Sequence, residues 1–385
     1  MSFLDKFGLG KKSPSVVGID IGSAFIKVVQ LRLARGKAVL ETYGAIALGP
    51  YAELAVGQAT NLSVEQTIKA LKDLFREASI TTTHMALSIP LRSSLVEVIE
   101  LPTFDKDKLN QMIPLEARKY IPVPISEVAL DWWIIPDQHF RAVEDASTEK
   151  IPIRGDNEKL VNKSRVLVVA IHNATIKKFQ DIATGSGLSL GTFEVEVFSG
   201  IRALLNRDIT TSAILDIGAS ASKLSIVDYG IVQVAHIIDR GAQDITIALS
   251  RALSIPFAQA EEAKRREGLT ATSHAVGISS TVTGESSNVA SSVLEYIFHE
   301  ASRVVIDYEK RRGRLVNRII LVGGGATLAG ILPLAQKSFE TEVVLGDPFY
   351  NVTAPPFLQE ILSQAGPEFT TAIGLALREL NAIAG

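Results

Sequence analysis

The chain has 385 residues, of which 46% are hydrophobic and 21% are charged, and its formal net charge is −3. This length predicts two to four compact units, and the apolar content excludes a disordered chain. The small net charge gives no electrostatic footprint for nucleic acid. The absence of cysteine excludes disulfides, thiol nucleophiles and thiolate metal sites, and the six histidines form no zinc-binding pattern.

No apolar run approaches the ~20 residues that a membrane-spanning helix needs. The N-terminus also lacks the apolar stretch and cleavage site of a signal peptide. We therefore expect a cytoplasmic protein. The first dozen residues, MSFLDKFGLGKK, are consistent either with one amphipathic turn or with a frayed terminus.

A short pattern occurs once in each half of the chain. Val16–Leu31 reads VVGIDIGSAFIKVVQL, and Ser212–Asp228 reads SAILDIGASASKLSIVD. Both copies contain Asp-Ile-Gly with a lysine seven residues after the Asp, and Asp216 follows Asp20 by 196 residues. Alternating β-branched runs flank a turn of small residues, so each copy predicts a β-hairpin. The repeat therefore predicts two lobes built on the same core.

Several helices are predicted between the two hairpins. Helical spacing of apolar residues covers Ser63–Ala78, with its first residue as the N-cap, and Asn173–Ala183. A shorter helix is predicted to end at Pro122. The polar stretch between His139 and Ser164 predicts a long exposed hairpin or loop.

The second half contains a long amphipathic helix and a glycine-rich turn. Apolar positions repeat at helical spacing over Asn288–Arg312. Arg318–Val322 predicts a buried strand, which leads into Gly323–Gly325 and then into a helix over Leu328–Ala335. A strand, a glycine turn and a helix N-terminus place backbone N–H groups where an anion or a nucleotide can approach.

The hairpin turns carry the main prediction about function. Turns of glycine, serine and alanine expose backbone N–H groups that can cradle phosphate oxygens, and the preceding Asp can hold a hydrated Mg²⁺. One copy would be equally consistent with an ordinary turn, but two copies plus a triple glycine favour a nucleotide site. Other nucleotide motifs fit poorly, because Gly8–Lys12 lacks the strand and hydroxyl of a P-loop and Gly185–Gly191 follows a helix.

This ordered set of motifs resembles the superfamily of actin, sugar kinases and heat-shock chaperones, which binds ATP between two lobes. Glu261–Arg265, reading EEAKR, looks like the adenine-contacting helix of DnaK-type chaperones. The resemblance implies that Glu261 and Lys264 hold the ribose and that Arg265 stacks on adenine. A solvated helix face is the alternative. The predicted nucleotide-binding residues are Gly22, Ser23, Ala24, Lys27, Gly218, Ala219, Ser220, Lys223, Glu261, Lys264, Arg265, Gly323, Gly324 and Gly325, and the predicted Mg²⁺-binding residues are Asp20 and Asp216.

Two further segments narrow the resemblance. Tyr120–Asp131 is similar to a segment typical of the PilM family of type IV pilus proteins, and Gly366–Arg378 looks like the closing helix of that family. The resemblance implies an α/β, two-lobed actin-like fold (a duplicated ribonuclease H-like fold) with an inserted subdomain of the FtsA and PilM type. The implied domains are a first lobe of residues 14–83, 191–208 and 367–385, an inserted subdomain of 84–190, a second lobe of 209–240 and 317–366, and a helical cap of 241–316.

The resemblance implies an ATP-binding scaffold of the pilus assembly platform, cytoplasmic and peripheral to the inner membrane. Its implied partner is the N-terminal tail of a PilN-like membrane protein, bound in a nucleotide-dependent way. Other platform proteins, assembly motors and further copies of the chain are additional candidate partners. Tyr120, Ile121 and Pro122 form an apolar corner that could line a groove for the tail or could be core packing.

A small-molecule, sugar-type kinase is the alternative function. Such an enzyme needs a carboxylate that accepts the proton of the substrate hydroxyl, and Asp239 and Glu194 are the two loosely plausible candidates. No residue can be assigned to positioning an attacking water. The sequence therefore predicts a slow ATPase at most.

Overall fold

The computed structural model describes residues 14–102, 106–136, 163–205, 209–270 and 283–384. The N-terminal dozen and most of the polar stretch 139–164 lie outside these described residues. The chain divides into two compact units. The larger comprises Met1–Leu91 with Lys177–Gly385, and the smaller is Arg92–Ile176.

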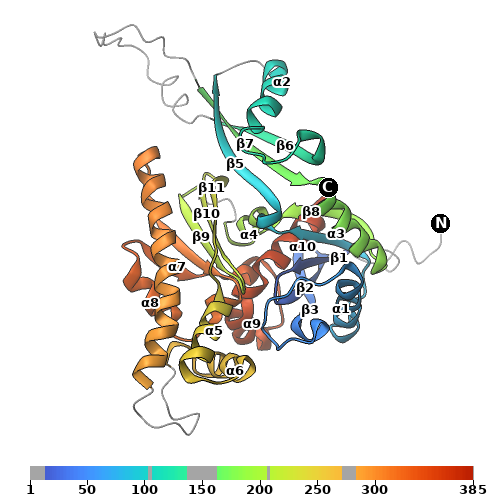
Figure 1. The fold of residues 1–385 in the computed structure, drawn as a ribbon. Coiled ribbons are helices and arrows are strands. Elements are labelled where there is room, and N and C mark those ends of the chain that lie inside the picture. The colour runs from blue at the N-terminus through green and yellow to red at the C-terminus, as the bar shows by residue number, and fades with distance from the viewer. Residues whose placement is uncertain (1–13, 103–105, 137–162, 206–208, 271–282, 385) are drawn as a thin grey trace, which may run out of the picture. The chain divides into compact units, whose positions relative to one another are not determined.

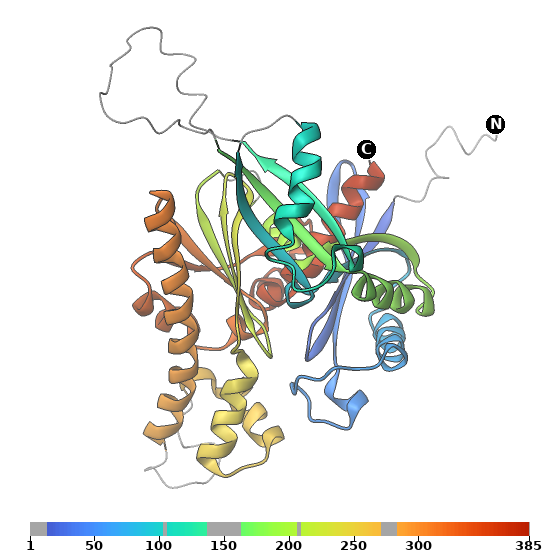
Figure 2. The same cartoon turned by 45° about the horizontal axis from the view of Figure 1, so that its top comes forward.

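Two five-stranded sheets of the same design form the larger unit (Figures 1 and 2). The first has the order β3-β2-β1-β4-β8 and the second has the order β11-β10-β9-β12-β13. In the first sheet, β1 runs antiparallel to β2 and parallel to β4. In the second sheet, β9 runs antiparallel to β10 and parallel to β12 in the same way. The strands are β1 (Ser15–Ile21), β2 (Phe25–Ala34), β3 (Lys37–Ala47), β4 (His84–Ile89), β8 (Ser189–Val195), β9 (Ser212–Ile217), β10 (Ser222–Asp228), β11 (Ile231–Ile238), β12 (Arg318–Val322) and β13 (Glu342–Leu345). The predicted duplication of hairpin and lobe is confirmed.

The helices of the larger unit follow from local sequence signals. α1 (Val64–Glu77) begins at a capping box, in which the Ser63 hydroxyl accepts from the amide of Gln66 and the Gln66 side chain accepts from the amide of Ser63. In the second lobe, α7 (Thr283–Arg312) lies along the sheet and supplies Leu294, Ile297 and Phe298 to its core (Figure 1). α3 (Asn173–Gly185) precedes β8 in the first half of the chain. Further helices of the second half are α5 (Ala242–Leu253), α6 (Phe257–Glu267), α8 (Ile331–Ser338) and α9 (Gln359–Ala365).

The glycine turn differs slightly from its prediction. A 3₁₀ turn occupies Gly324–Thr327, and the following helix begins at Ile331 instead of at Leu328. Gly330, which precedes this helix, has a φ of 87°, a left-handed conformation that interrupts a continuous helix. The triple glycine therefore ends in a short turn, not directly in the N-terminus of an α-helix.

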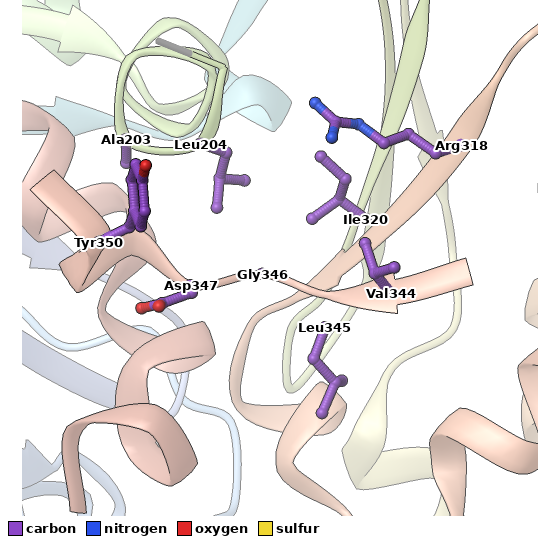
Figure 3. Close-up of a pocket in the computed structure, with 9 residues that line it drawn as sticks. All are labelled: Ala203, Leu204, Arg318, Ile320, Val344, Leu345, Gly346, Asp347 and Tyr350. Carbon is purple, nitrogen blue, oxygen red and sulfur yellow. The ribbon is translucent and has the colours of Figure 1, made fainter. Parts of the chain in front are cut away.

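The last helix of each half reaches toward the sheet of the other half, and α10 packs on it. α4 (Glu196–Leu204) follows the first sheet, yet its C-terminal end faces β12 and β13 across a small pocket (Figure 3). The pocket is lined by Ala203, Leu204, Arg318, Ile320, Val344, Leu345, Gly346, Asp347 and Tyr350. α10 (Thr370–Ala384) follows the second sheet but buries Ala372, Ile373 and Ala376 against Val16 and Val29 of the first.

The smaller unit is a three-stranded antiparallel sheet with one covering helix. Its strands are β5 (Ser94–Pro102), β6 (Val128–Ile135) and β7 (Lys163–His172), in the order β5-β7-β6. α2 (Lys106–Ala117) packs on one face, and Ile121 joins that core while Tyr120 stays 44% exposed. The unit covers fewer residues, Arg92–Ile176, than the range 84–190 expected for the inserted subdomain. The reason is that β4 and β8, at the two ends of that range, pair within the first-lobe sheet.

Candidate functional site

The two repeated turns have the same backbone hydrogen bond. The amide of Gly22 donates to the carbonyl of Phe25 at 3.0 Å, and the amide of Gly218 donates to the carbonyl of Ala221 at 3.1 Å. Because each glycine amide closes its own turn, a phosphate would have to be met by the amides that follow it. In both hairpins the Asp and the Lys of the motif are direct cross-strand partners, Asp20 with Lys27 and Asp216 with Lys223.

A partly buried ionic cluster surrounds the second of these lysines. Lys223 Nζ lies 3.0 Å from Asp216 Oδ2 and 2.6 Å from Glu196 Oε2. Glu196 is the first residue of α4 and belongs to the first half of the chain. Its other carboxylate oxygen, Oε1, accepts a hydrogen bond of 2.7 Å from the amide of Leu91. The cluster therefore connects the two lobes.

Charge is unbalanced in this cluster. Burial raises the pKa of the Glu196 carboxyl, Lys223 opposes this shift, and the charges of Asp216 and Asp20 reinforce it. Burial would lower the pKa of Lys223, but its acidic neighbours outweigh burial and raise it, so the ammonium stays protonated. Three carboxylates thus share one nearby ammonium, and the cluster would be stabilised by additional positive charge.

The first hairpin has a different set of partners. Asp20 Oδ1 accepts a hydrogen bond of 2.8 Å from the hydroxyl of Ser88, which is buried. Lys27 Nζ lies 3.7 Å from Glu368 Oε2, just before α10 begins. A Cβ atom added at Gly324 would lie 3.8 Å from this ammonium. Lys27 therefore lies beside the glycine turn of the other lobe.

The triple glycine packs against the second hairpin. Gly323 has a φ of 86°, and a Cβ atom there would lie 2.2 Å from Asp216 Oδ1. A Cβ atom at Gly325 would lie 2.3 Å from the side chain of Ile217. These two positions exclude any side chain, whereas the exposed Gly324 has no neighbour closer than the Lys27 ammonium. Gly324 alone of the three faces open space.

The predicted adenosine helix α6 is held by internal contacts. Glu261 and Lys264 are 5% and 7% exposed, so the interpretation as a solvated face is wrong for both. Lys264 Nζ donates to the carbonyl of Ala242, to Thr246 Oγ1 and to Glu261 Oε2. These three bonds use every hydrogen of the ammonium, so Lys264 has no donor left for a ribose in this conformation.

Glu261 is equally engaged. Its carboxylate accepts from Thr246 at 2.6 Å, from Lys264 at 2.6 Å and from Arg265 Nε at 2.7 Å. Burial raises the pKa of this carboxyl, but the Lys264 charge and the three hydrogen bonds outweigh burial and lower the pKa below its ordinary value. The Glu261–Lys264 pair is therefore ionised, and its buried hydrogen bonds to Thr246 and Ala242 connect α6 to α5.

α6 also contacts the first lobe. The Arg265 guanidinium lies 5.3 Å from the centroid of the Phe25 ring, at the start of β2. A Cβ atom at Gly57 would lie 2.5 Å from Glu261 Oε1, and the amide of Ala59 donates to Gln243 of α5. The predicted adenine-stacking residue is thus stacked on an aromatic ring of the opposite lobe.

A hydrated Mg²⁺ fits the charge of the site, because the three acidic side chains Asp20, Asp216 and Glu196 lie around the Lys223 ammonium. Direct ligation by several side chains does not fit, since no group of three or more His, Asp or Glu residues in the described ranges could hold a metal ion. Asp20 and Asp216 could therefore act on the waters of such an ion, as carboxylates commonly do for Mg²⁺.

The kinase alternative loses one of its two candidate bases. Glu194 is 6% exposed and accepts hydrogen bonds from Arg202 and Ser199 of α4 and from Arg378 of α10. Two guanidinium groups pair with this side chain within the larger unit, where it joins β8 to both helices. Glu196, which the sequence analysis missed, is the acidic residue beside the hairpin lysine. An acid directly after a buried strand was its one sequence signal.

Comparisons with known proteins agree with this geometry. The family model for type IV pilus assembly protein PilM matches residues 18–148, and the model for cell division protein FtsA matches residues 213–374. FtsA of Neisseria meningitidis is 23% identical, over 85% of this chain and 81% of that protein. FtsA of Bacillus subtilis is 20% identical, over 93% of this chain and 82% of that protein.

Solved structures with the same overall fold include a PilM complex and an MreB protein. The PilM-PilN type IV pilus biogenesis complex aligns with a TM-score of 0.75 at 21% identity, covering 96% of this chain and 99% of that one. MreB5 of Spiroplasma citri bound to AMPPNP aligns with a TM-score of 0.51 at 14% identity, covering 97% and 98%. The chain therefore has the actin-like fold, as the sequence predicted.

Within this class, the resemblance to PilM is confirmed by the family model and by the structural match, and FtsA is a further relative. No helix in the described part of the chain is both long enough and apolar enough to cross a bilayer.

Proposed function

We propose that the chain binds Mg-ATP between its two lobes and serves as a scaffold of type IV pilus assembly. The observation that carries the proposal is the approach of Lys27 and Lys223, from the two repeated hairpins, to the Gly323–Gly325 turn and Asp216. The bound nucleotide of the related MreB5 structure supports a nucleotide site in this fold. The PilM-PilN complex supports a PilN-like partner.

In this proposal the phosphates lie between the hairpins. Their oxygens accept from the amides of Ser23, Ala24, Ala219 and Ser220, the residues that follow the two turn-closing glycines. Both lysine ammonium groups neutralise the phosphate charge. Mg²⁺, when bound, supplies further neutralisation, and Asp20 and Asp216 orient its waters.

Adenosine then lies toward the glycine turn and α6. Gly324 admits it because no side chain occupies that space. Arg265 leaves the Phe25 ring and stacks on the adenine base, so adenine takes the place of Phe25 as the aromatic partner of the guanidinium. For Glu261 and Lys264, contact with the ribose requires at least one of the buried bonds between α5 and α6 to exchange.

The test of nucleotide binding is calorimetry of Mg-ATP against the wild type and Asp216→Asn. We expect binding by the wild type and a loss of roughly tenfold or more in affinity for the variant, or at least about 1.4 kcal/mol. Asp228→Asn is the matched control, because Asp228 ends β10, the strand paired with the β9 strand of Asp216, but pairs with Arg314 and Thr211. Equal affinity for all three proteins would place the site elsewhere.

The scaffold role predicts cytoplasmic localisation at the inner membrane, through the partner tail. Tyr120 is the residue to test, since it is 44% exposed while its neighbour Ile121 is buried in the core of the smaller unit. In a titration of a fluorescent PilN-like tail peptide, Tyr120→Ala should weaken binding by more than ~1 kcal/mol, as expected for an aromatic anchor.

Tyr350→Ala, which removes an exposed tyrosine of the larger unit, is the control for that titration. Unchanged affinity of a folded Tyr120→Ala protein would remove Tyr120 from the peptide site. A wild type that binds no peptide, with or without ATP, would contradict the partner itself. Binding to other platform proteins, to assembly motors or to further copies of the chain stays a prediction.

A further inference from the structure

The Glu196 carboxylate has two different partners on its two oxygens. Oε2 accepts from Lys223 of the second hairpin at 2.6 Å, and Oε1 accepts from the amide of Leu91 at 2.7 Å. Leu91 is the last residue of the larger unit before the chain enters the smaller unit at Arg92. One buried side chain therefore contacts both a lysine of the candidate site and the residue that precedes the smaller unit in the chain.

Strand pairing explains why these groups meet. β4 and β8 are parallel neighbours, with Ile89 opposite Val195. Leu91 is the second residue after β4 and Glu196 is the first residue after β8, so the amide and the carboxylate lie at the same sheet edge. Lys223 reaches this edge from β10 of the other lobe. The contact is therefore fixed by two rigid sheets, not by a mobile loop.

A bound polyphosphate would change the contact between Lys223 and Glu196. The phosphates of ATP are acceptors that compete for the three hydrogens of the Lys223 ammonium. If Lys223 turns toward them, Glu196 loses its cation while it remains buried. A buried carboxylate without a cation depends more strongly on its remaining donors, because an unpaired buried charge is costly. Among the described contacts, the amide of Leu91 is such a donor.

We propose that Glu196 is a positioning residue that transmits nucleotide occupancy from Lys223 to the Leu91 amide, and so to the point where the inserted unit begins. This inference rests on the proposed nucleotide binding. It assigns the nucleotide dependence of partner binding to one side chain, since the segment that responds is the entry to the unit that contains Tyr120.

The other hairpin provides an internal control. Lys27 pairs with Glu368 at 3.7 Å, in the turn before α10. Glu368→Gln would also remove the acidic partner of a hairpin lysine, but Glu368 follows β13 and precedes α10, far along the chain from the junction at Leu91. A general effect of neutralising an acid near the phosphates would appear in both variants.

The experiment is hydrogen exchange of the Leu91 amide, measured by mass spectrometry of overlapping peptides with and without Mg-ATP. Four full-length proteins are compared, each at a nucleotide concentration that saturates it by calorimetry: wild type, Glu196→Gln, Glu196→Asp and Glu368→Gln. Glu196→Gln keeps an acceptor for Leu91 but cannot pair with Lys223. Glu196→Asp keeps the charge but is one carbon too short to reach both partners.

We expect Mg-ATP to slow exchange at Leu91 by about threefold or more in the wild type and in Glu368→Gln, a local change that exchange resolves. In both Glu196 variants the nucleotide should leave the rate unchanged. An unchanged rate in nucleotide-saturated wild type, or an equal response in the Glu196 variants, would overturn the inference. Absence of ATP binding by the wild type in the calorimeter would instead remove the proposed function and the inference with it.

Discussion

Lys223 Nζ lies 2.6 Å from Glu196 Oε2, although the two residues belong to different halves of a duplicated fold. The corresponding lysine of the first hairpin, Lys27, pairs with Glu368 at 3.7 Å. Glu196 is the first residue of α4, and Glu368 lies in the turn directly before α10. The two lysines predicted to hold phosphate thus have acidic partners, for which a nucleotide would have to compete.

The glycine turn gives a prediction that separates binding from folding. Gly324→Val should reduce Mg-ATP affinity by roughly tenfold or more, about 1.4 kcal/mol, because its side chain would enter the space beside Lys27. Its melting temperature should stay near that of the wild type, since the nearest atom to the added Cβ, the Lys27 ammonium, lies at an ordinary contact distance of 3.8 Å. Gly323→Val should instead lower the melting temperature, because its φ is 86° and its Cβ would overlap Asp216. Wild-type affinity in a folded Gly324→Val protein would contradict the site.

The buried pair of α6 gives a prediction about stability. Lys264→Met leaves the Glu261 carboxylate buried without its ammonium, so urea unfolding should show a loss of about 3–5 kcal/mol. Glu261→Gln combined with Lys264→Met should recover part of this loss, because the uncompensated charge is gone. Additive losses in the double variant would show that the two side chains do not interact.

The same pair gives a pH dependence with a defined sign. The folded-state pKa of Glu261 lies below its ordinary value of 4.5. The stabilisation from its ionised form is therefore fully present above pH 4.5 and is lost as the pH falls through the lowered folded-state pKa. The difference in unfolding free energy between wild type and Lys264→Met should shrink over that acidic window. A constant difference would assign the effect of Lys264 to packing.

Glycines in β1 and in α4 give two substitutions whose effects on the free energy of unfolding should have opposite signs. A Cβ atom at Gly18 of β1 would lie 1.9 Å from the carbonyl oxygen of Ala372 in α10, so Gly18→Ala should destabilise by about 1–3 kcal/mol or more. A Cβ atom at Gly200 in α4 would meet only Thr370, at 3.9 Å. Gly200→Ala should therefore stabilise by about 0.5–1 kcal/mol, as for glycine replaced inside a helix. Denaturant midpoints measure both, and equal shifts would contradict the close contact.

Glu194 provides a test of the kinase alternative. Glu194→Gln removes a buried anion from between Arg202 and Arg378, so the protein should unfold at a lower denaturant concentration. Phosphate release in the presence of candidate hydroxyl substrates should be the same as for the wild type. A folded variant that specifically loses substrate-dependent phosphate transfer would make Glu194 a catalytic base and favour the kinase.

The sequence predicted what local patterns encode. The Asp-Ile-Gly hairpins, the Ser63 cap and the duplicated lobes depend on neighbouring residues, and all three were confirmed. Glu196 could not be predicted as a partner of Lys223, because a single acid after a strand has no motif and the contact forms between lobes. The burial of Lys264 was also not predictable, since a charged helix turn has the same sequence whether it faces water or another helix.

The crossing of α4 and α10 has a consequence for synthesis of the protein. β1 and β2 are among the first segments to leave the ribosome, but α10, which covers Val16 and Val29, is the last helix of the chain. The apolar face of the first sheet must wait for α10, and so for synthesis of the whole second lobe, before it gains this cover. Domains that fold during translation normally do so from the N-terminus. The first lobe of this chain is therefore expected to be completed only after the second lobe has been synthesised.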